Sequence, residues 1–236
     1  MIRLIIIAVL ALSSCAPVYV PNVRNSPMFT KGGEFQASVQ IGNGIEGQSA
    51  FAVTDHFGIM VNYSYIDATD PENEDDYLRH KLFEGGLGYF LNREDSFFEV
   101  FAGYGKGTGT TYESYNFFGS PEAAAATGRY NRYFIQPAFG VNKNDFQFSF
   151  APRITMVDFY EFSTEQFRTP IEGNEKFFFE PAVIGRINFN NHIFVTFQAG
   201  AALRMSEDIF FDRRKLQMAA GLGFRLGAAK ALVSRL

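Results

Sequence analysis

The stretch DFQFSFAPRITMV, residues 145–157, decides the fold of this chain because apolar and polar side chains alternate along it. One face of an extended chain carries the apolar residues Phe146, Phe148, Phe150, Ile154 and Met156. The other face carries Gln147, Ser149, Ala151, Arg153 and Thr155. A β-strand directs successive side chains to opposite sides, so this period of two predicts a strand with one apolar and one polar face.

Runs of the same kind recur along the whole chain, and they are longer than the strands of most soluble proteins. They cover residues 34–42, 45–54, 57–67, 77–91, 96–112, 128–142, 145–158, 175–189, 192–204 and 213–227. We therefore predict an all-β fold, a transmembrane antiparallel up-and-down β-barrel of about 10 strands, apolar toward lipid and polar toward its lumen. A single barrel domain would cover residues 34–227.

Short turns rich in Asn and Asp alternate with long connections, and long connections of such barrels lie outside the cell. In the long connection at residues 113–127, Ser120, Pro121 and the later Gly128 predict a one-turn helix. Aromatic residues are dense in these connections, which predicts outer-loop contacts with a partner. The residues expected to make them are Tyr115, Phe117, Phe118, Phe162 and Phe167. The alternative is that these aromatics fold inward as a lid over the lumen.

Composition agrees with a membrane barrel and excludes one class of partner. The chain has 28 Phe, 11 Tyr and no Trp, which suits aromatic outer surfaces. Its net charge is −4, with Lys and Arg scattered along the sequence, so a nucleic-acid partner has no electrostatic support. The expected partners are the lipid bilayer of the outer membrane and a protein of an envelope complex.

The amino terminus predicts export and lipidation. Residues 1–14 hold one positive charge and an apolar run too short to span a bilayer, as in a signal peptide. The following Cys15 is the only cysteine, and residues 12–15 (LSSC) resemble the lipobox of bacterial lipoproteins. Residues 15–33 contain Pro17, Pro21 and Pro27 and predict an extended periplasmic tether. Residues 228–236 would form a short periplasmic tail.

The sequence of this N-terminal region resembles that of a known family. Residues 19–22 (YVPN), 25–27 (NSP) and 31–35 (KGGEF) resemble the start of small outer-membrane barrel lipoproteins common in Bacteroidota, a group with no settled activity. The resemblance implies an outer-membrane location. Surface lipoproteins of that phylum usually carry acidic residues just after the lipidated Cys, and Ala16, Pro17 and Val18 do not match. This implies a lipid in the periplasmic leaflet.

The alternation also predicts which charged residues face the lumen. They are Glu46, Glu84, Glu99, Arg132, Arg153, Glu180, Arg186, Arg204 and Arg225. A barrel of about ten strands has little free interior space, and Glu with Arg makes strong bidentate pairs, so we expect a side-chain-filled lumen. Glycines at every second position from Gly103 to Gly109 leave room for long side chains from the opposite wall or for a small ligand.

The sequence predicts no enzyme, no cofactor and no metal site. His80 near the acidic residues 67–76 is the one candidate general base, and omptin proteases are ten-stranded barrels with such a rim. No omptin motif is present, however, and the acidic loop lacks calcium-loop spacing. The predicted function is therefore a structural or interaction subunit. The alternatives are a narrow channel or carrier for a small solute and, behind it, a rim hydrolase.

Overall fold

The computed structural model describes residues 17–71, 73, 75–117, 120–143, 145–164, 168–169, 175–189, 192–206 and 213–227, with backbone alone for 114–117, 120–124 and 168–169. The predicted signal peptide (1–14), Cys15 and the predicted tail (228–236) lie outside these residues. So do the side chains of Tyr115, Phe117, Phe118 and Phe167, four of the five predicted loop contacts.

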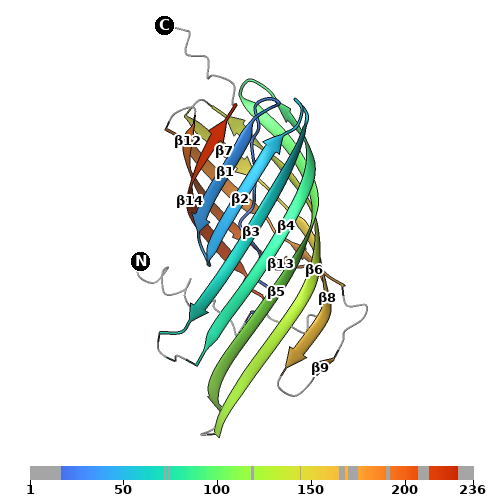
Figure 1. Cartoon of the computed structure of the whole chain (residues 1–236), viewed down its shortest axis with the longest axis vertical. Helices are drawn as coiled ribbons and strands as arrows, with labels where there is room; N and C mark the ends of the chain where they lie inside the picture. Colours follow the sequence, from blue (N-terminus) through green and yellow to red (C-terminus); the bar gives the residue numbers. More distant parts are fainter. Residues whose placement is uncertain are drawn as a thin grey trace.

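The described residues are all-β, and their strands form one closed antiparallel sheet (Figure 1). The strands are β1 (Phe35–Ile41), β2 (Ile45–Ala52), β3 (Phe57–Thr69), β4 (Tyr77–Asn92), β5 (Ser96–Phe117), β6 (Ser120–Asn142), β7 (Phe146–Phe150), β8 (Ile154–Thr164), β9 (Arg168–Thr169), β10 (Glu175–Phe179), β11 (Ala182–Asn188), β12 (Ile193–Ala201), β13 (Leu203–Arg204) and β14 (Leu216–Leu226). The first and last strands pair from Phe35 against Leu226 to Ile41 against Ala220, which closes the barrel. No helix long and apolar enough to cross a membrane occurs among the described residues.

Three barrel strands are each divided into two segments: β7 with β8, β10 with β11, and β12 with β13. Pro152 and Pro181 lack the amide hydrogen that a ladder requires, so the first two divisions fall at these prolines. Backbone hydrogen bonds still join these two strands across the divisions, in both directions between Ala151 and Ala182 (2.8 and 3.1 Å) and between Arg153 and Glu180 (3.1 and 2.7 Å). The two-residue β9 pairs with β8 alone and is not a strand of the barrel wall. With β9 left out and each divided strand counted once, the strands form the predicted ten-stranded up-and-down barrel.

The barrel has two different ends. The connections at 53–56, 93–95, 143–145 and 189–192 are short and share one end with Phe35 and Leu226, which we call the short-turn end. The connections at 70–76, 165–174 and 205–215 lie at the other end, the long-loop end, together with the short link at 42–44 and the tip of the β5–β6 hairpin.

One long connection predicted from the sequence is a strand pair instead. The loop and one-turn helix expected at residues 113–127 are wrong, because β5 continues to Phe117 and β6 begins at Ser120, with Glu113 paired to Ala124. Alanine is a strong helix former, but helix propensity is a small energy per residue, and the backbone ladder of the hairpin outweighs it. Beyond Tyr112, the last β5 partner of β4, residues 113–117 and 120–125 form a ribbon that projects past the neighbouring strands (Figure 1).

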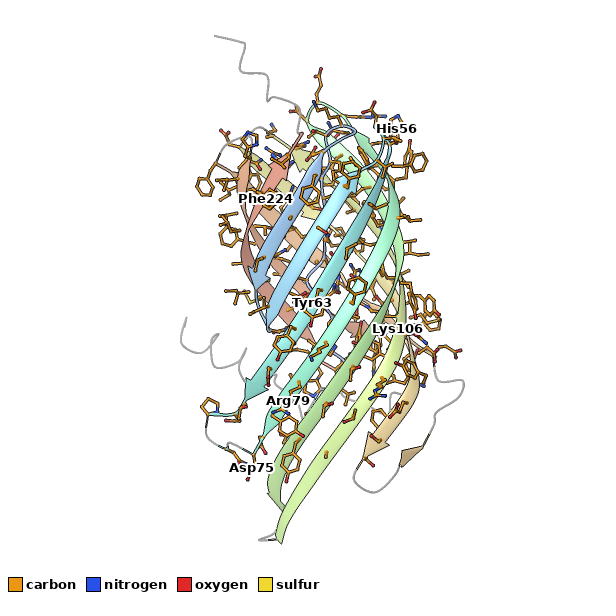
Figure 2. The ribbon with its side chains drawn as sticks, in the orientation of Figure 1. His56, Tyr63, Asp75, Arg79, Lys106 and Phe224 are labelled. Atoms are coloured by element: carbon orange, nitrogen blue, oxygen red, sulfur yellow. The ribbon has the colours of Figure 1, made fainter. Side chains whose placement is uncertain are left out.

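The outer wall is apolar over a band that has a clear boundary. On β3, Phe57, Ile59, Val61 and Tyr63 are exposed, whereas the residues between them are buried. Beyond Tyr63, toward the long-loop end, the outer surface carries exposed charged side chains such as Lys106 (Figure 2). A wall that is apolar outside and polar inside is stable only when lipid surrounds it, so the barrel spans a membrane.

The predicted periplasmic tether is not outside the barrel. Residues 18–29 are all buried, and they contact inward side chains of strands around the barrel. We call residues 17–33 the lumen segment. Residues 17–33 contain no helix or strand, apart from the bridge at Tyr19. The prediction placed them outside the barrel, and their position in the lumen corrects it, because a polar lumen wall satisfies the backbone of such a chain as well as water would.

Leu87 tests the assignment of the apolar band to lipid, because it is 71% exposed on the outer face of β4. We expect Leu87→Arg to lower the free energy of unfolding by about 2–4 kcal/mol, the cost of Arg near the bilayer midplane. Lys81→Arg, also exposed on β4 but beyond the band, is the control and should leave stability unchanged. Urea unfolding in lipid vesicles, followed by circular dichroism, measures both. Equal stability of the two variants would contradict a lipid-facing Leu87.

Candidate functional site

The candidate site is the barrel interior together with the segment that occupies it. At the long-loop end, Tyr19 forms a bridge to Arg213, and the Arg214 amide donates to the Tyr19 carbonyl (3.0 Å). At the short-turn end, the Gly32 amide donates to Asp55 Oδ1 (2.8 Å) and the Gly33 amide to the Ala52 carbonyl (2.8 Å). The segment therefore runs the length of the lumen before the chain turns into β1.

The wall is shaped for this segment at two glycines near the long-loop end. A Cβ atom added to Gly109 would lie 2.0 Å from the Val18 carbonyl oxygen, and one added to Gly128 would lie 2.7 Å from Val18 Cγ1. At Gly107 the occupant is different, since an added Cβ would lie 2.2 Å from the Tyr130 ring. These inward glycines thus make room for the segment's backbone and for an aromatic side chain.

Inward glutamines bind the backbone of the lumen segment. The hydrogen bonds join Gln217 Nε2 to the Pro21 carbonyl (2.7 Å), Gln48 Nε2 to the Val23 carbonyl (2.9 Å), Gln136 Nε2 to the Asn25 carbonyl (2.7 Å), and the Arg24 amide to Gln198 Oε1 (3.1 Å). The one β-bridge described for the segment joins Tyr19 to Arg213, outside the named strands, so its other buried amides and carbonyls need such partners. The four glutamines come from β14, β2, β6 and β12, and they hold the segment from different sides.

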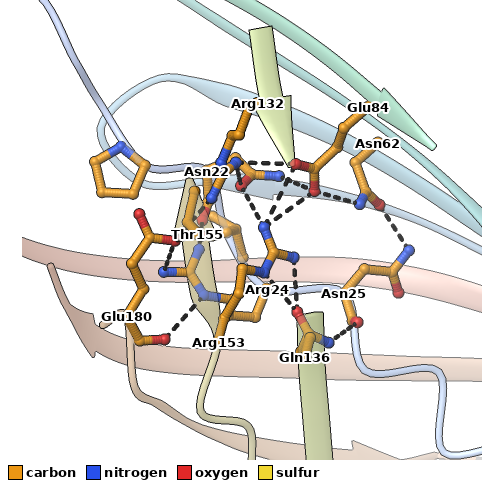
Figure 3. Close-up of polar contacts among 12 residues, drawn as sticks. Asn22, Arg24, Asn25, Asn62, Glu84, Arg132, Gln136, Arg153, Thr155 and Glu180 are labelled. Carbon is orange, nitrogen blue, oxygen red and sulfur yellow. Dashed lines mark hydrogen bonds and ion pairs between the residues drawn. The ribbon is translucent and has the colours of Figure 1, made fainter. Parts of the chain in front are cut away.

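A charge network lies at the middle of the lumen, and Figure 3 shows it. Its ion pairs join Arg132 to Glu84 (2.9 Å) and to Glu180 (2.7 Å), Arg153 to Glu84 (3.2 Å), and Arg24 to Glu180 (3.0 Å). All five side chains are buried, and a buried charge is tolerated only when it is paired and hydrogen bonded. Four of the residues were predicted to face the lumen, but Arg24 comes from the lumen segment.

Other side chains of the segment complete this network. Asn22 lies between three charged groups, donating to Glu84 Oε1 (2.8 Å) and accepting from Arg132 (2.6 Å) and Arg153 (3.1 Å). The Tyr19 hydroxyl donates to Glu180 Oε1 (2.6 Å). The carboxylates are therefore shared between wall arginines and the segment. Removing the segment would leave acceptor positions of both carboxylates without partners.

Two predicted lumen charges bind the segment and not each other. Glu99 accepts from Ser26 Oγ (2.5 Å) and from the Met28 amide (3.0 Å). Arg186 donates to the Pro27 carbonyl (2.9 Å) and the Ser26 carbonyl (3.1 Å). Met28 has a backbone φ of 55°, a costly conformation for a residue with a Cβ atom. The hydrogen bond from the Met28 amide to Glu99 stabilises this conformation.

The remaining predicted lumen charges have separate outcomes. Glu46 is buried and accepts from Ser64 Oγ (3.0 Å), and Arg225 is buried near the short-turn end. Arg204 pairs with the buried Phe178 and so lies on the predicted inward side of the sheet, but its side chain is exposed. It is the last residue of β13 at the long-loop end, where the wall no longer encloses the lumen.

An aromatic cluster closes the lumen at the long-loop end. Tyr19 stacks on Phe178 with ring centroids 5.0 Å apart and meets Tyr130 edge to face at 5.6 Å. Phe159 lies 5.1 Å from Tyr130 and contacts the half-buried Phe162 at 5.9 Å. The described member of the predicted loop contacts, Phe162, therefore packs against this cluster, as the lid alternative expected.

His80 belongs to this closed end. It is buried, and its Nε2 lies 2.7 Å from the Tyr130 hydroxyl. Of the described acidic-loop residues, Asp67 pairs with Arg79 on the outer surface (3.2 Å). The rim hydrolase hypothesis expected His80 beside a carboxylate, and the hydrogen-bond partner described for it is a phenol. No group of three metal-binding side chains occurs among the described residues.

Little space remains between the segment and the wall. The cavity beside Arg24, lined also by Gln48, Arg186 and Thr196, has a volume of about 10 Å³. A single water molecule needs about 10–15 Å³ by the same measure. The prediction of a filled lumen agrees with this geometry, but the lumen is filled by backbone as well as by side chains.

Comparisons with known proteins give fold-level likeness alone. No protein-family model matches this sequence, and no curated protein matches it. The translocator domain of the autotransporter NalP from Neisseria meningitidis has a TM-score of 0.49 at 8% identity, covering 82% of this chain and 86% of that chain. The N-terminal β-barrel domain of Pseudomonas aeruginosa OprF has a TM-score of 0.34 at 9% identity, covering 84% and 100%. A loop deletion mutant of OmpT, an outer-membrane protein of Vibrio cholerae, has a TM-score of 0.28 at 5% identity, covering 82% and 97%. At such low values, function has to be argued from the residues of this chain.

The charge network has three arginines and two glutamates, and this asymmetry makes a prediction. Glu180→Gln leaves three arginines and one carboxylate in the network and removes the ion-pair partner of Arg24, so we expect it to destabilise the barrel by about 3–5 kcal/mol, the usual result of breaking a buried pair. Arg24→Met leaves two of each sign and should cost less. The double variant should be more stable than Glu180→Gln alone. Urea unfolding in lipid vesicles measures all three, and a Glu180→Gln protein as stable as the parent would mean that the lumen is hydrated.

Proposed function

We propose that this chain is a lipoprotein of the bacterial outer membrane, anchored at Cys15, that acts as a non-enzymatic structural or interaction subunit of an envelope complex. A closed barrel with an even number of strands and an apolar outer wall is the architecture of single-chain bacterial outer-membrane proteins. The signal-like residues 1–14 and the lipobox-like residues before Cys15 support export and acylation.

The observation that carries this proposal is the filled lumen. A channel needs a continuous water path, whereas residues 18–29 are buried along the barrel, and the cavity beside them has a volume of about 10 Å³. An active site needs an accessible pocket with convergent polar groups, and these polar groups are occupied by the protein itself. The surfaces left for function are the outer wall and the long-loop end.

Electrical recording separates this proposal from the alternative of a narrow channel or carrier for a small solute. We expect the purified protein to show no steady openings in planar bilayers, because the lumen segment occupies the water path. A variant in which residues 17–30 are replaced by Gly-Ser repeats of equal length should conduct, because it lacks the side chains of Tyr19, Asn22 and Arg24 that anchor the segment to Glu84 and Glu180. Heat-modifiable migration on gels checks that the barrel is folded. Steady ion-selective openings of the parent would favour the channel.

The ribbon is the surface best placed to meet a partner. Residues 113–117 and 120–125 pair with each other and project beyond the strands that flank them (Figure 1). Residues 113–117 do not pair with β4, and residues 120–125 do not pair with β8. Uncovered strand edges offer hydrogen bonds to an incoming strand of another protein. The short turns at the other end have neither this length nor such an edge.

Removing the ribbon tests this role without disturbing the barrel. Tyr112 pairs with Ala125, so an Asn-Gly turn joining these two residues deletes residues 113–124 and keeps the register. We expect this variant to keep heat-modifiable migration and to lose a protein that co-purifies with the parent from native membranes. The double substitution Arg93→Ala with Glu94→Ala in a short turn is the control and should keep that protein. Retention of every co-purifying protein by the ribbon deletion would contradict a ribbon interface.

A further inference from the structure

We propose that the lumen segment carries the lipidated end of the chain to the cell surface, so that the acyl chains on Cys15 enter the outer leaflet of the outer membrane. The proposal rests on the acylation of Cys15 put forward above. It replaces the periplasmic-leaflet location implied by the sequence, and it concerns the path of the chain and not the chemistry of the anchor.

The orientation of the barrel in the membrane follows from its connections. Four short connections and the paired residues Phe35 and Leu226 lie at the short-turn end. In bacterial outer-membrane barrels the short turns face the periplasm and the long loops face the exterior. The chain therefore enters β1 from the periplasmic side and has already crossed the membrane once inside the lumen.

The direction of the lumen segment follows from the contacts at its two ends. Its C-terminal part lies at the short-turn end, where the Gly32 amide contacts Asp55. Its N-terminal part lies at the long-loop end, where Val18 fits against Gly109 and Gly128, and where Tyr19 meets Arg213 just before β14. Along β5, Gly109 is nearer the long-loop end than Tyr104, which lies level with Tyr133 at the boundary of the apolar band. The segment thus emerges on the outer side of the apolar band.

The chain between Cys15 and the lumen segment is too short to cross the membrane again. Cys15 is two residues before Pro17, and an extended chain spans at most about 3.6 Å per residue, so the two residues are at most about 7 Å apart. The hydrocarbon core of a bilayer is about 30 Å thick. An acyl anchor on Cys15 cannot reach the periplasmic leaflet while the segment occupies the lumen.

Withdrawal of the segment toward the periplasm would be costly. It would remove Arg24 from Glu180, Asn22 from Glu84, and the Ser26 hydroxyl and Met28 amide from Glu99. Each of these acceptors is a buried carboxylate, and a buried charge that loses partners is strongly unfavourable. The contacts therefore hold the N-terminal end of the segment at the exterior.

Cysteine labelling of intact cells tests the location directly. The parent should not react with a membrane-impermeant maleimide, since acylation blocks its only thiol. Pro17→Cys should react on intact cells as strongly as Asp75→Cys in a long loop. Asp95→Cys in a short turn should react only after the outer membrane is permeabilised. Labelling of Pro17→Cys with the pattern of Asp95→Cys, or of Asp95→Cys on intact cells, would overturn the proposal.

A disulfide tests the path of the segment without changing the residues next to Cys15. Ser26 Oγ and Ser149 Oγ are 3.0 Å apart, so Ser26→Cys with Ser149→Cys should form a disulfide in cells. The control is Ser26→Cys with Thr111→Cys, which should not cross-link. Thr111 is an inward residue of β5 near the long-loop end of the barrel. A free Ser26→Cys thiol beside Ser149→Cys would overturn the threaded path.

The same samples distinguish failure of this inference from failure of the lipoprotein proposal. Mass spectrometry of the mature N-terminus reports whether Cys15 carries acyl chains. Acylated protein with Pro17→Cys protected on intact cells keeps the lipoprotein and overturns the surface location. An unmodified Cys15 overturns the lipoprotein and with it the leaflet assignment, and the parent would then react with maleimide itself.

Discussion

The barrel depends on one constraint: the charged side chains buried on the inward strand faces must find partners inside the lumen. Glu84 and Glu180 have enough arginine on the wall for charge balance, since Arg132 and Arg153 face them. Charge balance does not satisfy all acceptor positions of two carboxylates, however, and Asn22, Tyr19 and Arg24 take the rest. The wall and the lumen segment are therefore one polar network, and neither is complete without the other.

The sequence predicted the fold because alternation is a local property. Each run of period two could be assigned to a strand by itself, and the inward positions of Glu84, Arg132, Arg153 and Glu180 followed from parity. The errors lie where local pattern does not determine structure. The alanine run at residues 123–126 favours a helix by local propensity, and its pairing with residues 111–114 of β5 places it in a strand.

The lumen segment could not be located from the sequence for a related reason. Prolines and polar residues at 17–33 predict an extended chain, and an extended chain can lie in the periplasm or in a polar lumen without any difference in composition. Two signals were present. The inward glutamines Gln48, Gln136, Gln198 and Gln217 carry amide groups that can bind a peptide backbone. The inward Gly109 leaves space for that backbone. Both features fit a peptide-binding lumen.

The position of the segment in the chain also bears on how the barrel closes. The contacts of the segment are remote in sequence, as between Tyr19 and Glu180, which are 161 residues apart, and contacts of this kind form slowly. The segment is joined directly to β1, and β1 closes the barrel against β14 at the other end of the sheet. Threading a charged chain through a finished barrel would expose Arg24 to each inward residue in turn. Laying it along the open sheet before β1 meets β14 would place its partners one strand at a time, so we expect closure of the barrel and burial of the segment to be coupled.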